Sequence, residues 1–221
     1  MSPLCRSGHA LLHQSCNLGM MWAAVLSRSP HESISSSPLT GRLSLHNGIG
    51  RRAERSHQPA LPRQTLRAGH ALLAQGSEQE AAFYIEAGIA RACHYTRDGQ
   101  ERCKEFYFEG ELCLLYDSWL TGSPARYQLE ALTELQVVRV PLALLEEPAW
   151  QPVCMALLRQ QLGYKERKEA FLLLHSPEER YRELCHTFPH WPARLTQVQL
   201  ANYIGITPVT LSRIRRRINT G

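Results

Sequence analysis

Residues 195–219 read LTQVQLANYIGITPVTLSRIRRRIN, and this stretch predicts two short helices joined by a tight turn. Leu200, Ala201 and Ile204 are spaced so that they share one apolar face of the first helix. Gly205 then supplies the left-handed backbone conformation that ends a helix at low cost. The first helix is therefore expected to bury its apolar face and to end at Gly205.

The second helix is predicted to begin at Thr207 and Pro208. Threonine caps a helix through its hydroxyl group, and proline at the first helical position loses no hydrogen bond. Leu211, Ile214 and Ile218 fall on one face of this helix. Two short helices that pack through apolar faces around a glycine turn are typical of the helix-turn-helix unit.

The opposite face of the second helix is polar and basic. It carries Val209, Thr210, Ser212, Arg213, Arg216 and Arg217. No carboxylate follows Glu183, so nothing in the segment neutralises these arginines. A helix with one buried face and arginines and hydroxyl groups on the other fits the major groove of DNA. The alternative is an amphipathic hairpin with a solvated basic face.

The composition indicates a globular, cytoplasmic protein. Of 221 residues 43% are hydrophobic and 20% are charged, and the formal net charge of +5 agrees with a polyanionic partner. No apolar run reaches the length of a membrane span, so we expect no membrane association. Seven dispersed cysteines without a CxxC pair favour a reducing compartment over a disulfide framework.

Residues 1–60 differ from the rest of the chain. They are rich in Ser, Arg, His and Gly, and Glu32 and Glu54 are their only acidic residues. An organelle transit peptide has a similar composition. We expect instead a disordered extension, or sequence that precedes the true start, because nothing here could form a core.

Residues 61–141 predict a small antiparallel β-barrel. At least six short extended runs are separated by turn residues, and Asp98-Gly99 between two such runs is a strong hairpin signal. The runs cover residues 72–74, 82–85, 89–95, 102–108, 127–132 and 135–140. Cys93, Cys103 and Cys113 are expected to be small buried strand residues, with a redox or iron–sulfur role as the alternative.

Residues 142–175 predict a long, mostly unbroken helix. Its apolar residues form an approximately heptad stripe: Val153, Leu157, Tyr164, Phe171 and Leu174. No helix of equal length exists to cover this stripe, so we expect it to pair with a second copy of the chain. The alternative is packing on the protein's own barrel. Ser176 to Glu179 is expected to cap a further helix over residues 178–186, within a domain of residues 176–221.

Barrel, long helix and terminal helix-turn-helix resemble the Crp/Fnr transcription regulators. The resemblance covers residues 62–218 and rests on Gln75-Gly76, Tyr84-Ile85-x-x-Gly88, Phe108-x-Gly110-Glu111-Leu112 and the stretch 195–218. It implies an α+β fold: an N-terminal double-stranded β-helix (jelly-roll) sensor domain, a dimerisation helix and a C-terminal all-α helix-turn-helix domain. It also implies a sequence-specific regulator that binds double-stranded DNA as a homodimer.

The resemblance assigns roles within the second helix. Arg213 falls at the guanine-reading position, and Val209 and Ser212 at the other base-facing positions. Phosphate contacts are implied for Thr196, Thr207, Arg215 and Arg217. We expect no β-hairpin wing after Gly221.

The sensor domain departs from the pattern of cyclic-nucleotide-binding relatives. Those relatives carry Gly-Glu and, after a short helix, Arg before Ser or Thr. Gly110 and Glu111 match, but the second half reads Ser123-Pro124-Ala125-Arg126. The arginine that pairs with a cyclic phosphate is out of place. We therefore expect no cyclic nucleotide, no metal and no other cofactor. Gly110, Glu111, Ser123 and Arg126 are the candidate pocket for a small-molecule effector that the sequence does not identify, with a surface or structural role of Glu111 and Arg126 as the alternative.

Two other functions compete with transcription regulation. The first alternative is a ligand-binding module that recruits a protein partner. If the protein is a transcription regulator, RNA polymerase is a candidate partner. An enzyme on this barrel would need several histidines and a carboxylate converging on a metal. The predicted strands offer only His94, so we expect no enzyme.

Overall fold

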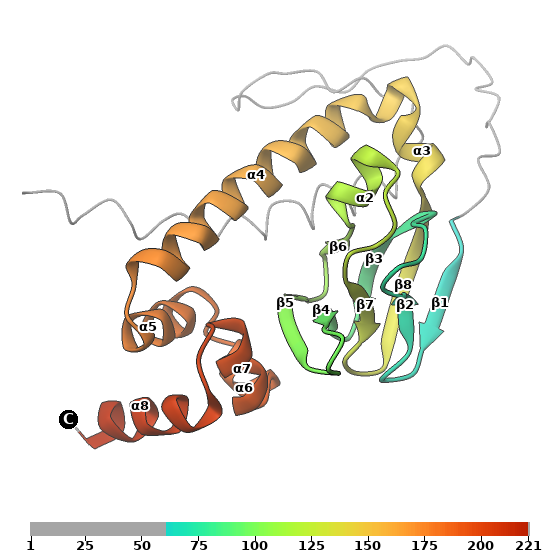
Figure 1. Ribbon diagram of the computed structural model, residues 1–221. Coiled ribbons are helices and arrows are strands. Elements are labelled where there is room, and N and C mark those ends of the chain that lie inside the picture. Colours follow the sequence, from blue (N-terminus) through green and yellow to red (C-terminus); the bar gives the residue numbers. More distant parts are fainter. Residues whose placement is uncertain (1–60, 221) are drawn as a thin grey trace, which may run out of the picture.

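The computed structural model describes residues 61–220, with side chains to residue 219, and predictions on residues 1–60 and Gly221 lie outside it. Two four-stranded antiparallel sheets form the N-terminal part (Figure 1). One has the strand order β1-β8-β3-β6: Arg63–Leu66, Leu135–Pro141, Ala81–Ala87 and Leu112–Cys113. The other has the order β2-β7-β4-β5: Ala71–Leu73, Gln128–Ala131, Ala90–Tyr95 and Glu101–Tyr107. The predicted jelly roll is confirmed.

The space between the sheets is filled by apolar side chains from both. Ile85, Leu135 and Val137 are fully buried there, and Ala92 and Leu129 complete the contact from the second sheet. Alternation along each strand sends these side chains inward. This core joins the two sheets.

The hairpin predicted at Asp98-Gly99 joins β4 to β5. Gly99 has a φ of 78°, a left-handed conformation that glycine adopts without strain. Thr96 N–H donates to Gln100 O at 3.0 Å and closes the turn. Strands β1 and β6, and the six-residue helix α2 (Tyr116–Thr121), were not predicted as elements of this chain.

The long helix is shorter than predicted. Residues 142–175 form α3 (Leu142–Glu146), a 3-10 turn η1 (Pro148–Trp150) and α4 (Gln151–Leu174). The break lies at Glu147, whose ψ of 141° is extended. Proline disfavours a helical conformation in the residue before it, so Pro148 interrupts the helix.

The stripe predicted to pair with a second copy faces the protein's own domains instead. Val153 and Leu157 are 6% and 3% exposed and pack against the first sheet, and Phe171 packs against the C-terminal helices. Leu174 does not belong to this buried face, because it is 79% exposed. The alternative of packing on its own barrel therefore holds for Val153 and Leu157.

Four helices follow α4: α5 (Pro177–Thr187), α6 (Trp191–Arg194), α7 (Gln197–Tyr203) and α8 (Pro208–Thr220). Ser176 and Glu179 form the predicted capping box at the start of α5. Residues 188–192 were predicted as a loop, but α6 begins at Trp191 and forms a single turn. None of the described helices is long and apolar enough to cross a membrane.

The C-terminal helices share a core with the second sheet. Phe106 at the end of β5 and Phe108 just after it lie against Trp191, with ring centroids 5.7 and 5.3 Å from the indole. Tyr203 contacts Trp191 at 4.9 Å, and Ile89 joins the same buried cluster. The second sheet and the C-terminal helices are therefore packed directly on each other.

Candidate functional site

Helix α8 has one buried and one exposed face, as its sequence predicts. Leu211 and Ile214 are 0% and 5% exposed and pack against α7 and α5. On the opposite face Val209 is 60% exposed, and Ser212 and Arg213 are also exposed. The three residues predicted to read bases therefore lie together on the free side of the helix.

Side-chain caps and one amide fix the relation between α7 and α8. The Thr196 hydroxyl accepts from Gln199 N–H at 3.3 Å at the start of α7, and the Thr207 hydroxyl accepts from Thr210 N–H at 3.1 Å at the start of α8. Gln197 Nε2 donates to Pro208 O at 2.9 Å and joins the two helices. Both threonines are exposed at helix N-termini, where phosphate groups are favoured.

The arginines of α8 differ in their surroundings. Arg213, Arg215 and Arg217 are all exposed. Arg217 forms an ion pair with Glu178 at the start of α5. Within the described part of the chain, Arg213 and Arg215 have no ion-pair partner. The predicted base-reading arginine is thus available, whereas Arg217 must exchange one anion for another to meet a phosphate.

The predicted effector residues do not converge. Glu111 accepts a hydrogen bond from Phe108 N–H at 2.9 Å, and burial raises the pKa of its carboxyl to about 8. Arg126 lies on the surface, 73% exposed, and pairs with Asp117 of α2 at 3.0 Å. Among the described residues, no hydrogen bond or ion pair joins Gly110 or Glu111 to Ser123 or Arg126.

Three tyrosines lie near this region and were not singled out in the sequence. Burial raises the pKa of Tyr107, Tyr116 and Tyr127, and each of the three interacts electrostatically with another. His94 packs edge-on against Tyr127 with centroids 5.3 Å apart, and its Nδ1 lies 3.1 Å from Arg126 O. The His94 ring therefore contacts both the Tyr127 ring and the Arg126 carbonyl group.

An ion pair connects the β-sheet domain to the C-terminal helices. Glu109, in the turn between β5 and β6, receives two hydrogen bonds of 2.7 Å from Arg194 of α6, and Gly88 N–H donates to it at 3.1 Å. Hydrogen bonding from Arg194 lowers the pKa of Glu109 to about 2. The Arg194 guanidinium also lies 4.9 Å from the Phe108 ring centroid. The pair was not predicted, because 85 residues separate its members.

A second network joins β5, α4 and α7. Glu105 is 8% exposed and accepts hydrogen bonds from the Tyr164 hydroxyl and from Lys168 Nζ, the latter at 3.2 Å. The Tyr164 and Tyr203 hydroxyls are 3.0 Å apart, and Lys168 Nζ lies 3.8 Å from the Tyr203 ring centroid. A buried carboxylate is tolerated here because a cation and hydroxyl groups surround it.

Arg180 of α5 connects the long helix to the turn of the helix-turn-helix. Its guanidinium donates to Leu172 O at 2.5 Å, to His175 O at 2.9 Å and to Ile204 O at 3.0 Å. These carbonyls belong to the end of α4, the residue after it and the C-cap of α7. Arg180 thus satisfies carbonyl groups that helix ends leave unpaired.

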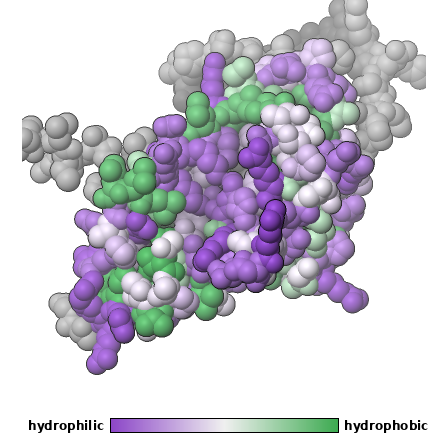
Figure 2. Space-filling model, viewed as in Figure 1, coloured by the Kyte–Doolittle hydropathy of each residue, from purple (hydrophilic) through white to green (hydrophobic). Residues whose placement is uncertain are grey.

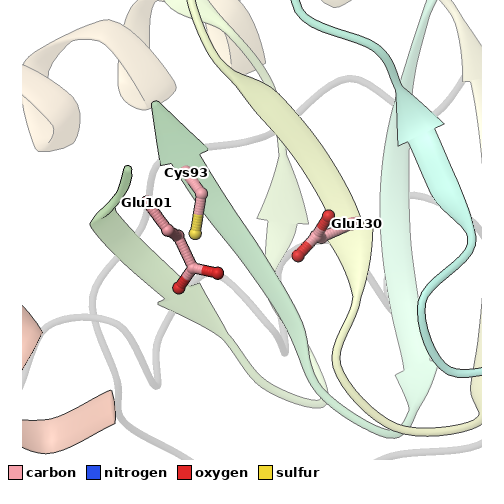
Figure 3. A group of neighbouring side chains, drawn as sticks. All are labelled: Cys93, Glu101 and Glu130. Atoms are coloured by element: carbon pink, nitrogen blue, oxygen red, sulfur yellow. The ribbon is translucent and has the colours of Figure 1, made fainter. Parts of the chain in front are cut away.

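One group of side chains has the composition of a metal site. Cys93 on β4, Glu101 on β5 and Glu130 on β7 place ligand atoms within 4.8 Å of one another (Figure 3). Arg91, however, pairs with Glu101 at 2.7 Å and with Glu130 at 2.5 Å. The guanidinium already supplies the positive charge that these carboxylates require, so the group is a buried ion-pair cluster. The free thiols Cys93 and Cys113 are fully buried, and Cys103 is partly buried.

Comparisons with known proteins agree with this architecture. Residues 63–147 match the family described as cyclic nucleotide-binding domain. Among curated proteins, no sequence matches the chain significantly.

Several solved structures share the fold over 72% of this chain. FixK2 from Bradyrhizobium japonicum is 18% identical, with a TM-score of 0.61 over 85% of its length. A CRP/FNR-family transcriptional regulator from Thermus thermophilus is 16% identical, with a TM-score of 0.61 over 86%. The c-di-GMP responsive regulator CLP from Xanthomonas campestris is 14% identical, with a TM-score of 0.57 over 87%. Residues 63–147 therefore match the cyclic nucleotide-binding domain family, and the described chain has the fold seen in solved structures of CRP/FNR transcriptional regulators.

Proposed function

We propose that the protein is a dimeric, sequence-specific DNA-binding transcription regulator. The observation that carries the proposal is the exposed face of α8, where Val209, Ser212 and Arg213 lie opposite the buried Leu211 and Ile214. A rigid helix that buries one face and offers an unpaired arginine on the other can enter the major groove.

Arg213 is the residue expected to specify sequence. Its guanidinium fork matches O6 and N7 of guanine, and no described carboxylate competes for it. Ser212 can donate to or accept from a base edge, and Val209 can contact a thymine methyl group. These contacts would read a short half-site.

Phosphate contacts would orient the helix. Thr196 and Thr207 lie at the N-termini of α7 and α8, where backbone N–H groups and the helix dipole attract anions. Arg215 is exposed further along α8, and Arg217 can reach a phosphate when Glu178 releases it. Such contacts strengthen binding to any sequence and fix the register.

The dimer would form through the exposed side of α4. Met155, Leu162 and Leu173 are 49%, 65% and 73% exposed. They are separated by seven and eleven residues, which at about 100° per residue places them within about 20° of one another. Hydrophobic surface gathers along α4 in Figure 2. A second copy would cover this stripe and set two α8 helices on two half-sites.

We infer that the sensor domain does not hold a cyclic nucleotide. Arg126 is committed to Asp117 on the surface, and the Glu111 carboxyl is hydrogen-bonded to Phe108 N–H. A phosphate in the predicted pocket would meet no cation from this set. We infer that the sensor responds to a different ligand or to none.

The test is selection from a pool of random duplex DNA by the full chain at two salt concentrations. The expected result is a two-fold symmetric site whose enrichment survives the higher salt. Arg97→Ala, which removes an exposed arginine in the β4–β5 hairpin, should select the same site. Binding that is indifferent to sequence and lost at moderate salt would overturn the proposal and leave α8 a solvated basic face.

A further inference from the structure

Two cysteines lie directly opposite each other where β4 and β5 pair. Cys93 of β4 is the register partner of Cys103 of β5, and both thiols are free. Within the described strands, no other two cysteines are paired in this way. Residues that face each other across an antiparallel pair send their side chains to the same face of the sheet. The register therefore brings the two sulfur atoms to one side of the second sheet.

The backbone hydrogen bonds of the hairpin show which residues of β4 bond to β5. Thr96 N–H donates to Gln100 O at 3.0 Å, so the backbone of Thr96 faces β5. Tyr95 instead exchanges both of its backbone hydrogen bonds with the Gln75 side chain, at 2.9 and 3.1 Å. Hydrogen-bonded and non-hydrogen-bonded pairs alternate along an antiparallel ladder. Tyr95 therefore belongs to a non-hydrogen-bonded pair of the β4–β5 ladder.

The cysteine pair is of this second, closer kind. Cys93 lies two residues before Tyr95, and the register runs without a shift from Tyr95 to Cys93. Cα atoms of a non-hydrogen-bonded pair are about 4.5 Å apart. A disulfide requires a Cα separation of about 4.4–6.8 Å. The bond can therefore form between Cys93 and Cys103 without movement of the two strands.

The surroundings of each sulfur atom agree with this placement. Cys93 Sγ lies within 4.8 Å of a Glu101 carboxylate oxygen, and Figure 3 shows the thiol turned toward Glu101. Glu101 and Cys103 are two residues apart on one strand, so they share a face. A hydrogen bond with Cys93, and then burial, raise the pKa of the Cys103 thiol. Both cysteines are thus directed to the same place on the sheet.

We propose that Cys93 and Cys103 form a reversible oxidation site, which hydrogen peroxide converts to a disulfide between β4 and β5. Cys93 is 0% exposed and Cys103 is partly exposed, so the peroxide meets Cys103 first. The Cys103 sulfur gives up its proton and attacks one peroxide oxygen. The S–O bond forms as the O–O bond breaks, and the released hydroxide takes up the proton as water. A sulfenic acid remains on Cys103.

The second step completes the disulfide. The Cys93 sulfur attacks the sulfenic sulfur of Cys103, so that the S–S bond forms as the S–O bond breaks. The departing oxygen leaves as water with the Cys93 proton. The two thiols have then lost two electrons and two protons, and the peroxide has been reduced to water. Because the reactive thiolate of Cys103 is scarce at neutral pH, the site responds to sustained exposure to peroxide and not to a brief pulse.

The disulfide would form beside the contact between the second sheet and the helices. Cys103 packs against the buried cluster that contains Tyr203 of α7. Its thiol donates to Glu105 O at 3.8 Å, and oxidation removes this donor. The Glu105 carboxylate in turn accepts hydrogen bonds from Tyr164 and Lys168 of α4. Formation of the bond does not depend on the proposed DNA-binding function, so it can be measured alone.

The test is treatment of the full chain with hydrogen peroxide, followed by blocking of free thiols, tryptic digestion and peptide mass spectrometry. Trypsin cleaves at both arginines between the cysteines, so the bond joins the peptides 92–97 and 103–104. We expect this link to be the main disulfide of the oxidised chain. Cys93 and Cys103 should be lost as free thiols together, and dithiothreitol should restore both. Oxidation of Cys103 to a sulfinic acid while Cys93 stays free, or a main link to another cysteine, would overturn the proposal.

Cys185→Ser is the matched control, because Cys185 is also a partly exposed free thiol and belongs to α5. This variant should form the same link, whereas Cys93→Ala and Cys103→Ser should leave the remaining thiol unlinked. Loss of the link in Cys185→Ser would count against the assignment.

Thermal unfolding of the unsubstituted chain gives a second measurement that needs no variant. The linked chain should unfold at a higher midpoint than the reduced chain, because a disulfide restricts the unfolded state. Dithiothreitol should reverse the shift. An equal or lower midpoint for the linked chain would contradict a bond that fits the native strands.

Discussion

Glu109 and Arg194 form the residue contact between the domains that is easiest to test. The carboxylate receives two hydrogen bonds from the guanidinium, and both side chains are more than one third exposed, at 40% and 36%. Solvent screens such a pair, so we expect Glu109→Gln to lower the free energy of unfolding by about 0.5–1 kcal/mol at pH 7. Urea denaturation measures this change. Glu86→Gln, which loses an exposed pair with Arg63 inside the sensor domain, is the control.

The pH dependence of this contact follows from its pKa. Arg194 lowers the pKa of Glu109 from 4.5 to about 2, so the folded protein binds this proton less tightly than the unfolded chain. The stability that the ionised Glu109 contributes is complete above about pH 4.5 and is lost as the pH falls toward 2. The difference between the parent and Glu109→Gln should shrink over that range. An equal difference at about pH 7 and about pH 2.5 would contradict the assignment.

Residue roles could be predicted from the sequence where they depend on neighbours in the chain. The predicted caps Ser176 and Thr207 act on N–H groups three residues later, and the turn at Gly205 needs only its own φ of 71°. Glu109 and Arg194, by contrast, meet only after the sheet and α6 are packed. No local pattern indicates such a partner.

At the scale of elements, Arg180 is the side chain that joins α4, α5 and the end of α7. It donates to three carbonyl groups, of Leu172, His175 and Ile204. Hydrogen bonds from a charged donor contribute more than neutral ones, and we expect Arg180→Ala to destabilise the protein by about 2 kcal/mol. Arg182→Ala, which removes an exposed ion pair within α5, should cost at most about 0.5 kcal/mol. Equal losses in urea denaturation would show that Arg180 has no connecting role.

Substitutions on the buried and the exposed face of α8 can be compared directly. Leu211 is fully buried and Val209 is 60% exposed. Leu211→Ala should lower the free energy of unfolding by about 2–5 kcal/mol, because it removes buried surface and leaves a cavity. Val209→Ala should change it by less than about 0.5 kcal/mol. Thermal unfolding by circular dichroism distinguishes the two, and similar losses would mean that the faces are assigned wrongly.

Helix α4 shows how far periodicity can be used to predict packing. The spacing of Val153, Leu157, Tyr164 and Phe171 indicates a buried face, and the structure buries it or half-buries it. The periodicity does not predict which part of the protein covers that face. The sheet and the C-terminal helices cover it, and Met155, Leu162 and Leu173 remain exposed on the other side. The choice between the two stripes requires the tertiary arrangement.

At the scale of the whole molecule, two copies of the chain are proposed to meet through the exposed stripe of α4. Leu162→Glu should abolish the dimer, because each copy would bury a charge opposite its twin and lose about 1.5–3 kcal/mol of apolar burial. Sedimentation velocity should give a dimer for the parent chain and a monomer for the variant. Leu120→Glu, at a leucine of α2 that is 60% exposed, should remain dimeric. A dimeric Leu162→Glu would place the interface elsewhere.

The overall architecture was more accessible to sequence reasoning than the effector site. Strand alternation, turn glycines and helix caps are local signals, and together they predict a barrel followed by helices. The effector region depends on where side chains from separate segments point, and there Arg126 lies on the surface and pairs with Asp117. Contacts between distant segments decide that outcome.

The most direct test of the central claim is the affinity of the parent chain, Arg213→Ala and Arg215→Ala for the selected DNA site and for each of its single-base-pair variants. Arg213→Ala should lose about 1–3 kcal/mol and relax the preference at one base pair in each half-site. Arg215→Ala should weaken binding to all variants alike, with a smaller dependence on salt. An Arg213→Ala protein that keeps the full preference at every base pair would contradict the account.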